Sequence, residues 1–512
     1  MEKNFTASDW ESYIPQPICE QHPEYGEFYR KAWKLVREHV KDIPGMPQTP
    51  YMDEGFCDTQ LWIWDTCFMS LFCKFAQSRF PGVESFQNFY AVLHGGKSLP
   101  AVIPTENEPH WTNAIPGVPY TLRVHIPDNP PLFAWGEYEN ALLHGDKAYL
   151  KALLYEKQSL QHHYEWFESL KEKKSFAGVF IPNKLLCEQY GYKWEGGCSG
   201  MDNTPRGRTC VPSPERPNNP DMLWLDAICQ QALSAKIVAR LFTFVGDTKN
   251  AQRWTEKFEE KKRIVNKLYW DDEDAFYYDI DSKTHAFYKV KTVASFWPLI
   301  AGIASEKQAA ALISHVLNPE TFGGNLPFPS LARNDAEFSE SGKYWRGSMW
   351  LPTAYATLRG MTEYGYHEEA AEAGFKIFDY MLKTYQSYEP HSIWECYAPV
   401  GYRPATDPDG IGTVRKDFCG WSALGPISVY LEYVLGFRYI NAFDHVVKWD
   451  KPDRFQSDVG IKNLRFGNVI TDIIANQNDC RVISNAPYTL EINGERFAIR
   501  QGENRFSIGQ MH

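Results

Sequence analysis

The sequence predicts an all-α toroid of six helical hairpins over residues 1–440, followed by a small antiparallel β-domain over residues 446–512. Three observations predict this fold class. Twelve segments carry apolar residues at helical spacing, and short turns alternate with long irregular loops between them. After about Asn441 the spacing changes to short alternating runs. Pairing helices across the short turns gives hairpins, and closing the hairpins into a ring buries an inner layer against an outer one.

The predicted helices follow from apolar stripes with a period of 3.6 residues. Phe28 and Leu35 belong to the stripe of the first helix, and Leu233 belongs to that of the sixth. Asp65 or Thr66 is the expected N-cap of the second helix, because short polar side chains accept hydrogen bonds from free helix amides. In chain order the predicted helices are 24–42, 65–80, 83–94, 132–144, 147–170, 221–245, 248–269, 293–304, 306–317, 350–364, 368–385 and 418–435. No repeat of fixed period is present, which disfavours a solenoid.

The predicted C-terminal strands are runs in which apolar and polar residues alternate, as expected for a sheet with one buried face. They include residues 469–474, 488–492 and 496–500. Asn493-Gly494 stands between the last two, and this pair favours a tight two-residue hairpin turn.

Composition excludes several classes of partner. The 512 residues carry a formal net charge of -11, which argues against a nucleic-acid-binding or anionic-membrane-binding surface. No apolar run is long enough to span a membrane and no secretory leader is visible, so the expected location is cytoplasmic. The 11 cysteines show no metal-type spacing and are expected to be reduced core residues. The 17 tryptophans fit either a large core or the stacking of sugar rings, and composition does not separate the two.

A long segment of turn residues, 190–220, separates two helical regions and contains Asp202 and Arg206. A loop of this length without periodicity is usually functional or disordered, and its aromatic residues argue against disorder. Gly200 and Asn203 permit tight backbone geometry around Asp202. The alternative interpretation is an Asx-turn in which Asp202 bonds only to its own backbone.

Polar residues occur beside tryptophans in several other loops, and no metal-ligand or phosphate-binding motif accompanies them. Cleavage of a glycosidic bond requires one carboxylic acid, a second carboxylate and aromatic side chains that hold the sugar ring. Each cluster alone is more often structural, so their recurrence at loop-to-helix junctions is what favours a functional interpretation. The clusters are Trp62–Asp65, Tyr344–Trp350, His391–Tyr397 and Asp417–Ser422.

Five blocks of the chain resemble glycoside hydrolase family 63, which includes processing α-glucosidase I, bacterial α-glucosidases and mannosylglycerate hydrolases. The most specific are Tyr-Trp-Arg-Gly-Ser-Met-Trp-Leu-Pro at 344–352 and Gly-Met-Asp-Asn-Thr-Pro-Arg at 200–206, and the others lie at 295–302, 326–335 and 393–397. The chain departs from the family at Cys396, where Asn is more common. The similarity covers most of residues 55–436, and the chain resembles a short form without a large N-terminal β-domain.

The resemblance implies an (α/α)6 barrel, an inverting mechanism and an α-linked substrate, with an α-glucoside favoured. It implies that Asp202 is the general acid, that Glu395 is the general base, and that Trp64, Asp65, Arg346 and Trp421 line the subsite for the non-reducing end. We also place Arg206, Trp345, Trp350 and Trp394 among the candidate substrate-binding residues, because they lie in the same clusters. The expected partner is a carbohydrate, and neither a metal nor a cofactor is expected.

Three alternatives stay open at this stage. One is a trehalase-like or rhamnosidase-like hydrolase with paired acids on the same scaffold. Another is a non-catalytic carbohydrate-binding relative, and a third is a phosphorylase or transglycosidase. The sequence predicts neither the linkage, nor the aglycone, nor the oligomeric state.

Overall fold

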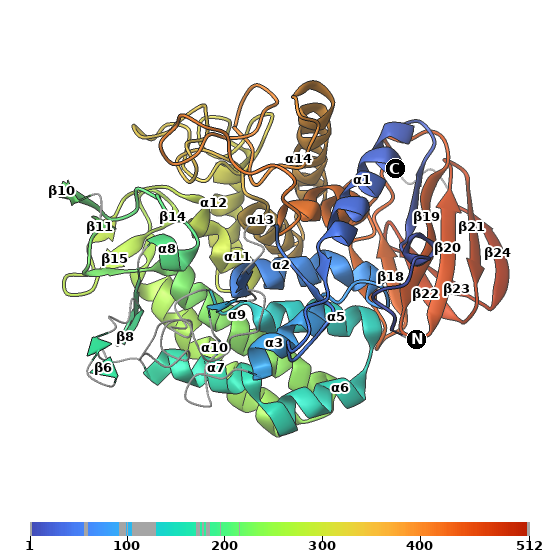
Figure 1. Ribbon diagram of the computed structural model, residues 1–512, viewed down its shortest axis with the longest axis horizontal. Helices are drawn as coiled ribbons and strands as arrows, with labels where there is room; N and C mark the ends of the chain where they lie inside the picture. The colour runs from blue at the N-terminus through green and yellow to red at the C-terminus, as the bar shows by residue number, and fades with distance from the viewer. Residues whose placement is uncertain are drawn as a thin grey trace.

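The computed structural model describes residues 3–55, 60–91, 99, 101–104, 130–169, 175–176, 179–180, 185–194, 196–213 and 216–508. Within these ranges the protein is helical, with a separate β-sheet region at the C-terminal end (Figure 1). The predicted end of the third helix at 92–94 and most of the predicted irregular segment 98–131 lie outside the described residues.

The helices match the predicted order, with some interruptions. Asp65 and Thr66 were expected as N-caps, but Trp62 takes that position and both residues lie in the first turn of α2. The segment predicted as one helix over 147–170 is divided by Gln158, whose φ is 51°. The helices are α1 (Pro23–Glu38), α2 (Ile63–Cys73), α3 (Phe86–Ala91), α5 (Phe133–His144), α6 (Lys147–Lys151), η4 (Ala152–Lys157), α7 (Ser159–Ser169), α8 (Gly196–Ser199), α9 (Leu225–Phe244), α10 (Thr248–Leu268), η5 (Val293–Phe296), α11 (Trp297–Ala301), α12 (Glu306–Leu317), α13 (Leu351–Glu363), α14 (His367–Ser387), η6 (Ser422–Leu424) and η7 (Gly425–Val434).

Helix-to-helix contacts follow the chain. The helices α2, α5, α9, α11 and α13 contact one another in that order, α13 contacts η6, and η6 contacts α2 again. The outer partners are α10, which packs on α9, and α14, which packs on η7. The outer helices are amphipathic, whereas α2 is buried along its whole length. A helix that is apolar on all sides needs protein around it, which explains why α2 lies inside.

An aromatic column runs along these inner helices. Trp64 packs on Phe68 with ring centroids 4.9 Å apart, and Phe68 packs on Trp135 at 5.9 Å. Trp135 then stacks on Tyr355 at 5.8 Å. The column begins in the first turn of α2 and extends to Tyr355 on α13, so it joins three of the inner helices.

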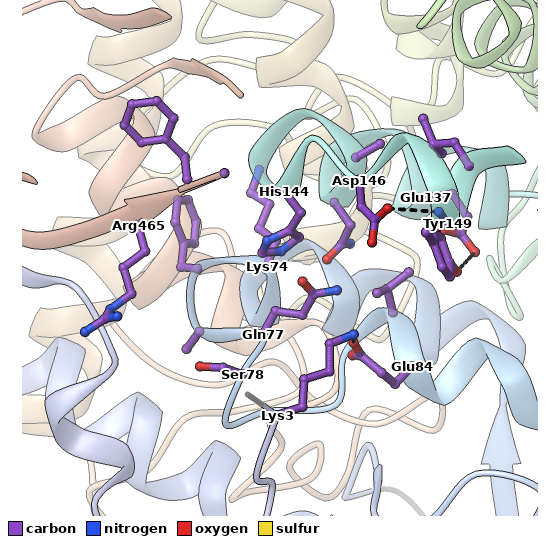
Figure 2. Close-up of a pocket in the computed structure, with 18 of the residues that line it drawn as sticks. Lys3, Lys74, Gln77, Ser78, Glu84, Glu137, His144, Asp146, Tyr149 and Arg465 are labelled. Carbon is purple, nitrogen blue, oxygen red and sulfur yellow. Dashed lines mark hydrogen bonds and ion pairs between the residues drawn. The ribbon is translucent and has the colours of Figure 1, made fainter. Parts of the chain in front are cut away.

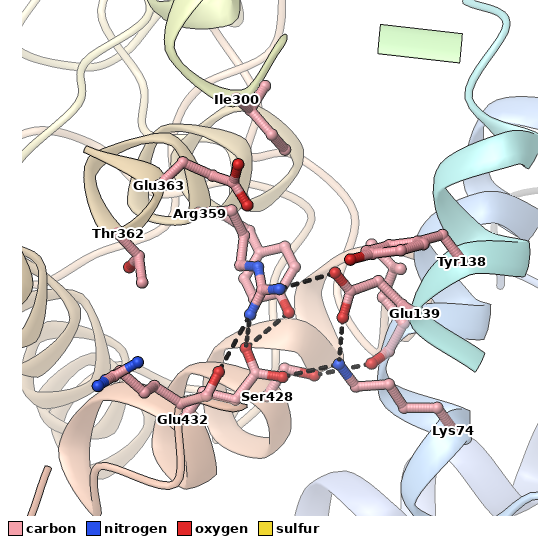
Figure 3. Close-up of polar contacts among 12 residues, drawn as sticks. Lys74, Tyr138, Glu139, Ile300, Arg359, Thr362, Glu363, Ser428 and Glu432 are labelled. Carbon is pink, nitrogen blue, oxygen red and sulfur yellow. Dashed lines mark hydrogen bonds and ion pairs between the residues drawn. The ribbon is translucent and has the colours of Figure 1, made fainter. Parts of the chain in front are cut away.

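A buried ion-pair network closes the far end of the column (Figure 3). Lys74 lies 3.0 Å from Glu139 and 2.8 Å from Glu432, and Arg359 lies 2.7 Å from Glu139. Tyr355 donates a hydrogen bond to Glu432 at 2.7 Å. Because each buried charge has partners of opposite sign, the network ties α5, α13 and η7 together at the end opposite Trp64.

Two sheets form the C-terminal region, which lies on one side of the molecule in Figure 1. The first has the order β1-β19-β20-β21-β24 and the second β17-β18-β22-β23, so the N-terminal strand β1 completes the first sheet. The strands are β1 (Gln16–Cys19), β17 (Tyr439–Asn441), β18 (Val446–Trp449), β19 (Val459–Phe466), β20 (Val469–Ala475), β21 (Asp479–Ser484), β22 (Tyr488–Ile492), β23 (Glu495–Ile499) and β24 (Gly502–Ser507).

The hairpin predicted at Asn493-Gly494 is confirmed, because β22 and β23 pair antiparallel around it and both turn residues have positive φ. The expectation of a purely antiparallel domain is wrong at one pair of strands. β18 and β22 run parallel, because the chain crosses to the first sheet between them. Alternating apolar spacing cannot reveal this, since it is the same in both kinds of sheet.

Short strands frame the segment 190–220, and apart from a short hairpin or turn expected at 277–281 they were not predicted from the sequence. β8 (Leu186–Glu188), β9 (Gly191–Lys193), β12 (Met222–Leu223), β15 (Asp279–Asp281) and β16 (Phe287–Tyr288) form one sheet. Runs of two or three residues carry no detectable periodicity, which is why they escaped prediction. The remaining strands are β2 (Val40–Lys41), β3 (Tyr51–Met52), β4 (Gln60–Trp62), β5 (Val102–Pro104), β6 (Ser175–Phe176), β7 (Val179–Phe180), β10 (Arg208–Ser213), β11 (Arg216–Asn218), β13 (Trp270–Asp271) and β14 (Phe276–Tyr277).

Candidate active site

Asp202 stands on a tight, glycine-rich turn directly after the short helix α8. Gly200 adopts a φ of +80°, and a side chain there would approach the Trp64 ring at 3.4 Å. A Cβ on Gly196 would come within 2.5 Å of the Asp202 carbonyl oxygen, so only glycine fits. The turn therefore packs closely on itself and on Trp64, which fixes the position of the carboxyl group.

Asn203 fixes the other side of this turn to the segment Lys343–Arg346. Its side chain donates to the Lys343 carbonyl oxygen at 3.0 Å and accepts from the Trp345 amide at 2.8 Å. Arg346 Nε donates to the Asn203 carbonyl oxygen at 3.1 Å. These contacts join two loops that lie about 140 positions apart in the sequence.

Glu395 is buried, and its carboxylate is held from three sides. The Tyr344 hydroxyl donates to Oε1 at 3.0 Å, and Arg415 Nη1 donates to the same atom at 2.8 Å. The Arg415 amide donates to Oε2 at 3.2 Å. Trp421 Nε1 and the Ser422 hydroxyl both donate to the Glu395 carbonyl oxygen. Donors of this kind stabilise an ionised carboxylate and restrict its orientation.

The carboxyl group of Asp202 has a different environment. Its side chain is open to solvent by surface area, yet protein surrounds it in most directions. This partial burial and the negative charge of Glu395 raise the pKa of Asp202 to about 7, against the opposing effect of Arg415. Burial and the charges of Glu395 and Asp202 also raise the pKa of Tyr344. The hydroxyl that contacts Glu395 thus lies within the field of both carboxylates.

Asp65 is the third carboxyl group of this region. It is buried in the first turn of α2 beside Trp64. Burial raises the pKa of Asp65 well above its usual range, and the negative charge of Glu395 adds to the effect. Glu395 therefore acts electrostatically on both Asp65 and Asp202, although the three residues come from distant segments of the chain.

The predicted tryptophans pack around this region. Trp345 and Trp350 stack with centroids 4.2 Å apart, and Trp350 contacts Trp421 at 5.6 Å. Trp345 and Trp350 are each 1% exposed, whereas Trp64 and Trp421 are 7% and 8% exposed. The first two are therefore almost fully enclosed, and the second two expose slightly more of their surface. Trp394 is also buried and packs edge-on against Tyr388.

The two predicted arginines occupy different environments. Arg206 is 1% exposed, and its guanidinium donates to Asp226 and Asp279 while it lies over the Trp224 ring. Because the Arg206 guanidinium is paired with two buried carboxylates, it is not available to a sugar. The expectation that Arg206 contacts the substrate is therefore replaced by a structural role next to the Asp202 turn. The Arg346 side chain is 27% exposed and pairs with Glu337.

Sequence reasoning missed two residues of this region as site members. Tyr344 begins the block 344–352 that resembles family 63, so its hydroxyl could have been predicted as a site residue. Arg415 carried no local signal, because a single basic residue in a loop is common. It reaches Glu395 through backbone pairing of its segment, in which Trp394 lies opposite Lys416.

No group of three or more metal-ligating side chains occurs within the described ranges. No helix in the described part of the chain is both long and apolar enough to cross a membrane.

Comparison with known proteins gives a family match. Residues 60–407, more than half of the chain, match the family model of the mannosylglycerate hydrolase MGH1-like glycoside hydrolase domain. An uncharacterised protein of Borreliella burgdorferi is 25% identical over 89% of this chain and 88% of its own length.

The characterised relatives match over shorter stretches. A mannosyl-oligosaccharide glucosidase of Saccharomyces cerevisiae is 26% identical over 52% of this chain and 33% of its own length. A cytosolic neutral trehalase of Kluyveromyces lactis is 27% identical over 37% of this chain and 26% of its own length. The chain therefore spans about a quarter to a third of these two enzymes.

Solved structures agree in fold. The mannosylglycerate hydrolase of Thermus thermophilus, solved in complex with glucose, superposes with a TM-score of 0.57 at 16% identity, over 78% of this chain and 99% of that one. Together with the family match, these findings define the protein as a glycoside hydrolase. The chain belongs to the mannosylglycerate hydrolase MGH1-like group of glycoside hydrolase family 63.

Proposed function

We propose that this protein is an inverting α-glycosidase that removes a terminal α-linked sugar, with Asp202 as general acid and Glu395 as general base. The observation that carries the proposal is the contrast between the two carboxyl groups. Asp202 has a pKa of about 7 and can hold a proton near neutral pH. Glu395 accepts hydrogen bonds from Arg415 and Tyr344, which fix the orientation of its carboxylate. One carboxyl group that can hold a proton and a second one held in place by donors are the pair that glycosidic cleavage requires.

In the proposed reaction Asp202 protonates the leaving glycosidic oxygen. Glu395 removes a proton from a water molecule that attacks the anomeric carbon from the opposite face, so the product has inverted configuration. This requires the two carboxyl groups to lie about 6.5–9.5 Å apart, which leaves room for the water. Asp65, Trp64, Arg346 and Trp421 are the proposed contacts to the sugar.

The scaffold of the proposal is an (α/α)6 toroid over residues 1–440. The cyclic order of helix contacts, which leads from α2 through α5, α9, α11, α13 and η6 back to α2, supports this closure. In a toroid the N-terminal ends of the inner helices meet at one rim. Trp64 and Trp350 stand at such ends, in agreement with a site at that rim.

Product stereochemistry tests the mechanism. The protein is incubated with α-linked substrates, including trehalose, kojibiose, nigerose, maltose and mannosylglycerate, and the first product anomer is identified by proton NMR. Release of the attacked sugar as its β-anomer supports the proposal, and release of that sugar as its α-anomer contradicts it. Trehalose, whose leaving glucose is itself an α-anomer, gives equal amounts of both anomers under inversion and only the α-anomer under retention. Glu395→Gln should reduce turnover by roughly 10²–10⁴-fold, because the water then lacks its base.

Trehalose is the favoured second candidate for the substrate, because a trehalase is among the relatives. Trehalose turnover faster than that of every other α-glucoside in the panel would select it. A protein that binds these sugars and cleaves none of them would instead fit a non-catalytic role.

A further inference from the structure

A cavity of about 340 Å³ lies between the helical region and the C-terminal strands (Figure 2). One wall is a face of α5, where Glu137, Asn140 and His144 follow one another at helical spacing. The end of β19 contributes Phe466, and Glu84 closes the side near the N-terminal segment. The described residues that line this cavity include none of the proposed catalytic or sugar-contacting side chains.

Two buried oxygen atoms of this wall have no hydrogen-bond partner among the described residues. Glu137 is 1% exposed, and its Oε1 accepts from Tyr90 at 2.7 Å and from Tyr149 at 2.9 Å, but its Oε2 has no partner. Asn140 is 3% exposed and donates through Nδ2 to the Gly136 carbonyl oxygen, but its Oδ1 has no partner. Buried polar atoms are nearly always satisfied, so these two indicate a bound group that forms hydrogen bonds with them.

Lys74, the cationic side chain of the lining that lies deepest in the protein, is already paired with Glu139 and Glu432. Burial raises the pKa of Glu137 to about 7 and lowers the pKa of His144 to about 3. The carboxylate of Glu84 is paired with Lys3 at 2.6 Å. A neutral ligand with several hydroxyl groups therefore fits this wall better than a polyamine, which would require unpaired carboxylates.

We propose that the cavity is a second, non-catalytic binding site for a small polyhydroxylated molecule of the monosaccharide class. A ligand hydroxyl donates to Asn140 Oδ1, and another exchanges a hydrogen bond with Glu137 Oε2, accepting from the protonated acid or donating to the carboxylate. The C–H surface of the ligand meets Phe75, Phe466 and Leu150, which also line the cavity. Binding pockets commonly combine such apolar walls with a few convergent polar groups. The site joins the helical region to the C-terminal strands and is independent of the catalytic proposal.

Calorimetric titration with D-glucose, myo-inositol and spermidine tests the proposal. Ala141 is 7% exposed and lines the cavity, so Ala141→Leu fills part of the space. Thr362→Leu is the matched control, because it enlarges a side chain in a separate cavity of about 570 Å³. We expect glucose or myo-inositol binding that weakens at least tenfold in Ala141→Leu and stays unchanged in Thr362→Leu, with hydrolysis unaffected in both.

Binding that is equally strong in Ala141→Leu overturns the proposal, as does binding of spermidine without binding of either polyol. If Ala141→Leu does not fold, wild-type crystals soaked in glucose give the answer. A sugar ring bonded to Glu137 and Asn140 supports the site, and isolated water molecules at both atoms refute it.

Discussion

Replacing Asp202 with Asn should strongly reduce hydrolysis and at the same time stabilise the protein at alkaline pH. The native state binds the Asp202 proton more tightly than the unfolded chain, because the pKa is raised from 3.8 to about 7. The stabilisation that this proton provides is fully present below about pH 4 and is lost as the pH rises through about 7. Asparagine never ionises, so the variant does not lose this contribution.

The size of the effect follows from the raised pKa of Asp202. At about 1.36 kcal/mol per pKa unit the raised value corresponds to about 4 kcal/mol as an upper limit. Solvent reaches the side chain and screens its interactions, so we expect about 1–2 kcal/mol. Since unfolding entropy is roughly 2.1 cal/mol/K per residue, a chain of this length should gain about 1–2 °C in melting temperature at pH 8.

The assay compares melting temperatures of the wild type and Asp202→Asn at pH 4 and pH 8, together with hydrolysis of the best substrate. The two proteins should melt together at pH 4, where both side chains are neutral, and separate at pH 8. Turnover should fall roughly 10²–10⁴-fold, because the leaving group then lacks its acid. Equal melting temperatures at both pH values would refute the raised pKa, and undiminished hydrolysis would refute the catalytic role.

Three further predictions concern polar contacts, two of them near the site and one at the far end of the helices. Tyr344→Phe removes one hydrogen-bond donor to Glu395. Because a hydrogen bond to a charged group contributes about 1.5 kcal/mol, kcat should fall about tenfold. If both kcat and the acidic limb of the pH profile stay unchanged, Tyr344 does not position Glu395. Arg206→Met leaves two buried carboxylates unpaired and should destabilise the protein by about 3–5 kcal/mol, measured by urea unfolding. Wild-type-like stability would show that the pairing is dispensable. Arg359→Met, at the far end of the helices, should destabilise the fold by a similar amount while KM stays constant, and a changed KM would indicate coupling to the site.

The wild-type pH dependence of hydrolysis gives an independent check. Because Asp202 must be protonated, kcat/KM should decline as the pH rises above about 7. If kcat/KM of Tyr344→Phe declines with the same midpoint, this alkaline limb belongs to Asp202 and not to Glu395. Activity that rises steadily to pH 9 would contradict the assignment of Asp202.

The order of helices was predictable, because apolar periodicity is a local property of the sequence. Long segments such as α9, α10 and α14 appear within a few residues of their predicted ends. The interruption after η4 and the strands around the Asp202 turn were not predictable. They depend on single residues with positive φ and on pairing between distant short segments, and neither leaves a periodic pattern.

The sequence by itself determined which residues could do the chemistry, since the types and spacing of Asp202, Glu395 and the tryptophans are written in the chain. Only the tertiary structure decided the surroundings of each of these candidates. Burial and ion pairing depend on contacts between residues that are distant in the sequence. The packing of the chain therefore pairs Arg206 with two buried carboxylates and places Arg415 beside Glu395. The same packing gave two chemically similar acids different environments, because the field at each carboxyl group is set by neighbours that come from other parts of the chain.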